Sequence, residues 1–195
     1  MNQRSGKTVK ICLLAMLAAL AILLEYFANL TIPMLGGNMK ISFAGLPVIL
    51  AAMLMGPWAG FAAGFVSSFL GQVVSYGLTV TTLLWVLPAA VRGLTVGYLF
   101  RWFRGRTNPL LVGTEITVSG LIVTAFNTLA IYADSKIFGY YKPEIILGFL
   151  GLRILSSAAT SVVCTLIALP LYHVLSKRLM GQGTHGGRTA GKITD

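Results

Sequence analysis

The chain has 195 residues, of which 56% are hydrophobic and only 10% are charged, whereas soluble domains carry about 25% charged residues. This composition excludes a soluble globular domain. Fifteen Lys and Arg residues against five acids give a net charge of +10. The basic residues lie between apolar blocks, so the charge indicates membrane topology rather than nucleic-acid binding.

Roughly six apolar blocks approach the ~20 residues that a helix needs to cross a bilayer. They comprise residues 9–30, 42–56, 58–76, 81–101, 111–133 and 145–177. Pro57 lacks an N–H and disfavours helical geometry at Gly56, so the second and third blocks should form a tight hairpin. The predicted fold class is an all-α integral membrane protein, a six-transmembrane-helix bundle over residues 9–180.

The loops predict the orientation of this bundle. Ten Lys and Arg residues flank the termini and the segment between the fourth and fifth blocks, against three on the opposite side. By the positive-inside rule both termini should be cytoplasmic, in a bacterial plasma membrane. We expect a short cytoplasmic tail at 1–8 and a disordered cytoplasmic tail at 181–195. Residues 186–193 nearly match a phosphate-binding loop, but no strand and helix frame them, so we expect no nucleotide site there.

Three charged side chains inside the blocks require an explanation, because a charge near the centre of a span costs at least ~2.5 kcal/mol. Glu25, Arg92 and Arg153 should lie ~8, ~16 and ~12 Å below the outer face. Snorkelling would let them converge in one outward-facing cavity. A structural ion pair is the alternative, but it leaves one arginine for an anionic ligand, and a planar guanidinium suits a carboxylate.

Other polar and aromatic residues fall at a similar depth and are further candidates for substrate binding: Gln72, Trp85, Asn127 and Tyr132. Trp85 and Tyr132 could equally belong to an interfacial aromatic belt, and Asn127 could serve a helix–helix hydrogen bond. The Gly- and Pro-containing segment 31–42 has the composition of a mobile cover or a plain connector. Phe138, Tyr140 and Tyr141 could stack on a flat ring or rest at the membrane interface.

Small residues indicate where helices approach each other closely. Gly60 and Gly64, like Gly93 and Gly97, are spaced for packing inside the bundle. Ala15 and Ala19 lie in the cytoplasmic half of the first helix, about 100° around the axis from Glu25. One helix can therefore line an outer cavity and also present a smooth face for docking a partner.

Enzymatic function is not indicated. No nucleophile stands beside a base, and His173, Cys12 and Cys164 lack partners at metal-ligand spacing, so we expect no catalytic residue, metal or cofactor. A secondary transporter or channel is an alternative, although no internal repeat supports it. A purely structural subunit is another, but it would need no buried arginines.

The sequence resembles the S components of energy-coupling-factor (ECF) vitamin transporters. The resemblance rests on Ala15 and Ala19, on Lys40-Ile-Ser-Phe-Ala-Gly-Leu-Pro47 with Leu54-Met-Gly-Pro-Trp-Ala-Gly60, and on Leu87-Pro-Ala-Ala-Val-Arg-Gly93. It is nearest the folate-type branch, although Ser67-Ser68 replaces an acidic residue that many members carry.

This resemblance implies a protein that binds a vitamin from outside, with folate or a related carboxylate as the expected ligand and cobalamin or pantothenate as alternatives. It also implies docking through Ala15 and Ala19 on a transmembrane T component, which works with two cytoplasmic ATPases.

Overall fold

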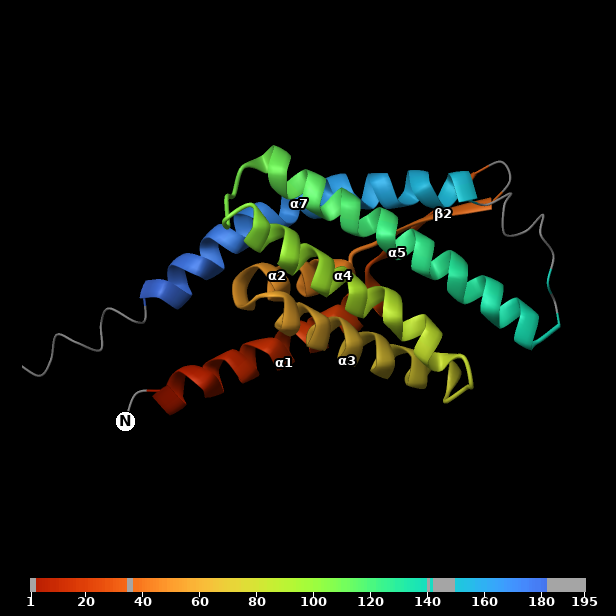
Figure 1. The fold of residues 1–195 in the computed structure, drawn as a ribbon, viewed down its shortest axis with the longest axis horizontal. Coiled ribbons are helices and arrows are strands. Elements are labelled where there is room, and N and C mark those ends of the chain that lie inside the picture. Colours follow the sequence, from red (N-terminus) through yellow and green to blue (C-terminus); the bar gives the residue numbers. More distant parts are fainter. Residues whose placement is uncertain (1–2, 35–36, 140, 142–149, 182–195) are drawn as a thin grey trace, which may run out of the picture.

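The computed structural model describes residues 3–34, 37–139, 141 and 150–181. The elements are α1 (Gln3–Phe27), β1 (Asn29–Met34), β2 (Gly37–Ser42), α2 (Gly45–Met55), α3 (Pro57–Tyr76), α4 (Thr82–Trp102), α5 (Pro109–Ile137) and α7 (Leu150–Gly181). The long helices lie side by side, and both α1 and α7 have their free ends at the same end of the bundle (Figure 1). We call this the termini end and the opposite one the hairpin end. The predicted 181–195 tail lies, from 182 on, outside the described residues.

The helical fold is confirmed, but six full-length spans are not. Among the described residues, five helices are long and apolar enough to cross a membrane, whereas α2 is a shorter apolar helix. Its 11 residues rise about 16 Å, roughly half the hydrocarbon thickness. Nine of them are buried, because α2 packs among α1, α3, α4 and α7. The block 42–56 is therefore mostly core and does not by itself make a full crossing.

A β-hairpin occupies much of the segment predicted to be a cover or connector. Strands β1 and β2 pair antiparallel, with Asn29 opposite Ser42 and Met34 opposite Gly37. The alternation of Leu30, Ile32 and Met34 with less apolar residues is typical of a strand, a signal hidden by the Pro and Gly residues. The hairpin ends at Ser42, directly before α2, so it leads into the interior of the bundle.

The predicted tight turn between α2 and α3 is confirmed. Gly56 has φ 99°, a left-handed conformation that favours glycine, and its N–H donates to the Ala52 carbonyl at 2.9 Å. Pro57 is the first residue of α3, where its missing N–H would have had no helical partner. The chain therefore reverses within one peptide.

The two glycine pairs bring α3 and α4 into backbone contact, as predicted. A Cβ atom at Gly60 would lie 2.8 Å from the Gly93 carbonyl oxygen, and one at Gly93 would collide with the Gly60 backbone. Gly64 and Gly97 meet the backbones of Ala89 and Pro57 in the same way. These backbone contacts fix α4 against α3, and α4 carries Trp85 and Arg92.

Helix α1 presents two different faces. Leu17, Ala18 and Ala21 are buried, and Leu17 belongs to the main hydrophobic core with α2, α4, α5 and α7. Ala15 and Ala19 are exposed. The separation of an inward face from a smooth outward face therefore matches the helical spacing.

Candidate functional site

The larger of two adjoining cavities has a volume of about 780 Å³ and lies among α1, α3, α4, α5 and α7. Such a volume is typical of small-molecule sites. Six of the seven residues proposed for substrate binding line it: Glu25, Gln72, Trp85, Arg92, Asn127 and Arg153. Residues that were selected by their depth in the membrane therefore come from five helices and line one cavity.

A smaller lobe of about 350 Å³ lies between α5 and α7. The two cavities share five of their lining residues: Ser42, Arg92, Val123, Asn127 and Arg153. We call this set the junction. Because the two arginines stand at the junction, a molecule that extends from one lobe into the other passes both guanidinium groups.

Arg153 carries the clearest sign of an incomplete site. Its Nη1 atom is buried and has no hydrogen-bond partner among the described residues. A buried charged donor without a partner costs several kcal/mol unless something completes it. Arg153 lies on the first turn of α7 and lines both lobes, so a ligand at the junction can supply the missing acceptor.

Arg92 is held against the start of α2. A Cβ atom at Gly45 would collide with the Arg92 guanidinium, so glycine lets this side chain lie close to the backbone of α2. Pro88 lies inside α4 one turn before Arg92 and also lines the larger cavity. Proline lacks the N–H of a helical hydrogen bond, so α4 has one backbone hydrogen bond fewer beside the cavity.

Glu25 lies at the contact of α1 with α3. A Cβ atom at Gly71 would stand 3.2 Å from Glu25 Oε2, so glycine permits this close approach. The next residue, Tyr26, donates its hydroxyl to the Gly71 carbonyl at 3.2 Å and lies 2.6 Å from the Ser75 hydroxyl. These contacts fix the end of α1 against α3 and hold the carboxylate at the cavity wall.

Another part of the wall of the larger cavity combines a ring with small polar groups. Trp85 lines the larger cavity, and its carbonyl accepts a hydrogen bond from the Ser68 hydroxyl at 3.4 Å. Ser67 and Ser68, which replace an acidic residue of the resembled family, both line this cavity. A flat ring can stack on Trp85 while small hydroxyls avoid repelling an anion.

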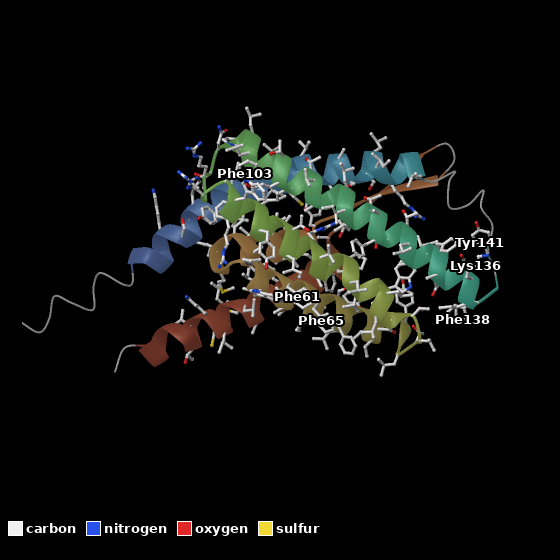
Figure 2. The ribbon with its side chains drawn as sticks, in the orientation of Figure 1. Phe61, Phe65, Phe103, Lys136, Phe138 and Tyr141 are labelled. Carbon is white, nitrogen blue, oxygen red and sulfur yellow. The ribbon has the colours of Figure 1, made fainter. Side chains whose placement is uncertain are left out.

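Tyr132 does not line either lobe. Its ring meets that of Tyr141 edge-on at 5.5 Å, and Lys136 Nζ lies 4.4 Å from the Tyr141 ring centre. Lys136, Phe138 and Tyr141 gather at the end of α5 (Figure 2), and Phe138 lines the larger cavity. The belt-like interpretation therefore fits Tyr132 better, and Tyr140 lies outside the described residues.

The sequence prediction missed Glu115. This side chain is 1% exposed, and neither carboxyl oxygen has a hydrogen-bond partner among the described residues. It lies on α5 one turn from Ser119, which lines the smaller lobe. The sequence signal that could have identified it is an acidic residue inside the apolar block 111–133. In the described part of the chain, no three His, Cys, Asp or Glu residues group as a metal site.

The hydroxyl lining of the smaller lobe was also missed. It comes from α5 and α7 and includes Ser119, Thr124, Ser157, Thr160 and Ser161. Ser157 and Ser161 are four residues apart, a helical spacing that places both on one face. The repeated Ser and Thr residues in block 145–177 were the signal.

Comparison with known proteins identifies the family. The family model described as "ECF-type riboflavin transporter, S component" matches residues 5–177. A solved S component of a bacterial ECF transporter shares the fold with a TM-score of 0.66 at 22% identity, over 89% of this chain and 98% of that one.

Three curated relatives are each called UPF0397 protein. That of Lactobacillus gasseri is 33% identical over 50% of this chain, and the chain spans about half of its length, 51%. That of Lactobacillus johnsonii is 29% identical over 70% of this chain and 77% of its own. That of Streptococcus agalactiae serotype Ia is 30% identical over 65% and 68%. The chain is a multi-pass membrane protein that belongs to the family of ECF-type riboflavin transporter S components, which are substrate-binding membrane subunits.

Proposed function

We propose that this chain binds a vitamin-sized molecule in the two-lobed cavity and delivers it for ATP-driven uptake. The observation that carries the proposal is the buried Nη1 of Arg153, which lacks a partner among the described residues and lies where both lobes meet. A ligand acceptor at this point would offset the cost of burying the donor.

The favoured ligand is a vitamin that carries a carboxylate, as in folate. Arg92 and Arg153 both line the junction, and a guanidinium fork binds a carboxylate through two parallel hydrogen bonds. Asn127 would help to orient this group. Glu25 and Gln72, on the walls of the larger lobe, would receive the neutral or donating parts of the molecule, and Trp85 would stack on its ring.

Riboflavin is the second candidate. The matching family is described by this vitamin, and Trp85 and Phe138 both line the larger lobe, which suits a flat ring system. Carbonyl oxygens of a neutral ring can also accept from Arg153, at lower strength than a carboxylate. Cobalamin and pantothenate are further candidates, which identification of the bound molecule would distinguish.

We propose that the cavity faces the outside of a bacterial plasma membrane and that both termini are cytoplasmic. The support is the ten-to-three asymmetry of Lys and Arg between the two sides, which follows the positive-inside rule. In this orientation the six helices of the described residues cross or enter the membrane, with α2 contributing a short buried segment. A cysteine introduced after Met180 should react only with membrane-permeant reagents, and labelling by impermeant reagents in intact cells would reverse the orientation.

Ala15 and Ala19 form the proposed docking face for a transmembrane T component, which would act with two cytoplasmic ATPases. Both residues are exposed on α1, away from Ala21 and Glu25, which line the larger lobe. Small residues permit close helix approach. Ala15→Trp or Ala19→Trp should therefore abolish energised uptake and leave ligand binding intact. Equal loss of binding in detergent would place this face in the bundle core.

Mass spectrometry of the small molecule retained by the purified protein tests the ligand. A carboxylate-bearing vitamin is the expected result, and a flavin would select the second candidate. Uptake by liposomes that contain this chain alone tests the alternative of a self-sufficient transporter or channel. The S-component proposal predicts binding without sustained accumulation, whereas accumulation would overturn it.

A further inference from the structure

The smaller lobe has a polar wall that the arginines do not explain. Its hydroxyl groups come from two facing helices, Ser119 and Thr124 on α5 and Ser157 and Ser161 on α7. Gly120 lets these helices meet, since a Cβ atom there would lie 2.6 Å from Ser157 Oγ. The lobe, of about 350 Å³, is therefore a hydroxyl-lined pocket that opens at the junction.

The hydrogens of three of these hydroxyls are already committed to their own helices. Ser119 Oγ donates to the Ile116 carbonyl at 2.9 Å, and Thr124 Oγ1 donates to the Gly120 carbonyl at 2.9 Å. Ser161 Oγ donates to the Ser157 carbonyl at 2.8 Å. A hydroxyl has one donor hydrogen and two acceptor lone pairs. Each of the three can therefore offer only lone pairs to a molecule in the lobe.

The two ends of the lobe thus have opposite hydrogen-bonding character. At the junction, Arg92 and Arg153 can only donate. Between α5 and α7, Ser119, Thr124 and Ser161 can only accept while their helix bonds persist. A carboxylate is matched at the junction, whereas the lone pairs of these three hydroxyls favour a group that donates.

We infer that the smaller lobe binds a hydrogen-bond-donating arm of the substrate, one that carries hydroxyl or amide N–H groups. The ring or main body of the same molecule occupies the larger lobe, and its acceptor group lies at the junction. This assignment rests on the proposed function and on riboflavin, its second candidate, as the transported molecule, because it describes which part of that molecule enters which lobe. It selects a ring compound with a polar, donor-bearing chain over a compact ring or a simple dicarboxylate.

Two probes and a matched pair of variants test the assignment. Riboflavin carries a polyhydroxyl chain on its ring system, and lumichrome has the same tricyclic skeleton, as the alloxazine tautomer, without that chain. Thr124→Val keeps the side-chain shape and removes an acceptor from the lobe. Thr117→Val is the control, because Thr117 Oγ1 also donates within α5, to the Gly113 carbonyl at 2.8 Å, and the residue does not line the lobe.

Binding is measured by quenching of flavin fluorescence on the purified protein. The wild type should bind riboflavin at least tenfold more tightly than lumichrome. Thr124→Val should weaken riboflavin binding about 3- to 10-fold, as expected for one hydrogen bond, and leave lumichrome binding unchanged. Thr117→Val should change neither. Ser161→Ala provides a second variant with the same expectation if Thr124→Val does not fold.

Wild-type protein that does not prefer riboflavin, including one that binds neither probe, would overturn the assignment. An equal response to Thr124→Val and Thr117→Val would also overturn it. These failures differ from a failure of the proposed function, which is tested by Arg153→Gln. If that change releases the retained molecule while the Thr124 result is negative, the cavity binds a ligand but its arm lies elsewhere. If Arg153→Gln has no effect, the proposed function itself fails.

Discussion

Two helix interfaces of this protein use glycine in opposite ways. Between α3 and α4, Gly60 and Gly93 face each other and the two backbones touch. Between α5 and α7, Gly120 faces the hydroxyls of Ser157 and Ser161 instead. The first interface is closed, whereas the second contains the hydroxyl-lined lobe.

The comparison shows that glycine alone does not determine how closely two helices pack. Glycine opposite glycine allows backbone contact, which in a membrane is favoured by van der Waals packing. Glycine opposite serine lets the hydroxyls occupy the space that a Cβ would fill, and these hydroxyls then line the neighbouring lobe. The closed interface holds Trp85 and Arg92 in place, and the open one provides space for a ligand.

Gly93→Ala should have the largest effect on stability. The added methyl meets the Gly60 backbone, which cannot move aside as a side chain can, so the cost should reach the upper part of the ~1–3 kcal/mol typical of overpacking. Gly113→Ala is the matched control, because its nearest neighbour is Thr165 Cγ2 at 3.7 Å.

Thermal unfolding in detergent should show a clear fall in melting temperature for Gly93→Ala. Gly113→Ala should match the wild type or exceed it, since alanine is favoured over glycine by up to ~1 kcal/mol in a helix. Equal behaviour of the two variants would contradict backbone contact between α3 and α4.

Gly120→Ala should have an intermediate effect. Its Cβ atom would meet hydroxyl oxygens, Ser157 Oγ at 2.6 Å and Ser161 Oγ at 3.1 Å, and the ends of these side chains can rotate. We expect a loss of about 1 kcal/mol that the second change Ser157→Ala largely restores. A double-mutant cycle of melting temperatures measures this coupling. Additive effects would mean that the two helices do not meet at Gly120.

Glu115→Met should have the smallest effect and the opposite sign. The buried carboxyl has no hydrogen-bond partner among the described residues, so a flexible apolar side chain of similar size removes an unfavourable burial. We expect a gain of about 1 kcal/mol, seen as a higher melting temperature in detergent. Glu115→Gln, which keeps the polar group, should not give this gain. A fall for Glu115→Met would reveal a polar partner of Glu115.

The sequence predicted the closed interface better than the open one. Spacing alone identified Gly60, Gly64, Gly93 and Gly97, because backbone contact depends only on small residues at helical intervals. Charge in apolar blocks identified Arg92, Arg153 and Glu25 as cavity residues, because a charge inside an apolar span needs an explanation that the sequence of that span alone reveals. Both signals are local to one helix.

Features that depend on a partner segment were not predicted. Tyr132 was assigned to the cavity from its depth, but depth does not specify the direction around α5, and its ring lies against Tyr141 instead. The hydroxyls of the smaller lobe line a common pocket only because α7 faces α5. Pairing of β1 with β2 was hidden by Pro and Gly residues that are typical of loops.

The amount of small molecule that the purified protein retains tests the central claim most directly. Mass spectrometry should find this molecule in the wild type and much less of it in Arg153→Gln, because loss of a buried charged partner costs about 2–5 kcal/mol of binding. Arg153→Lys should recover only part of the occupancy, since a point charge cannot make the two-pronged contact. Wild-type occupancy in folded Arg153→Gln protein would contradict the account and make Arg153 a structural residue.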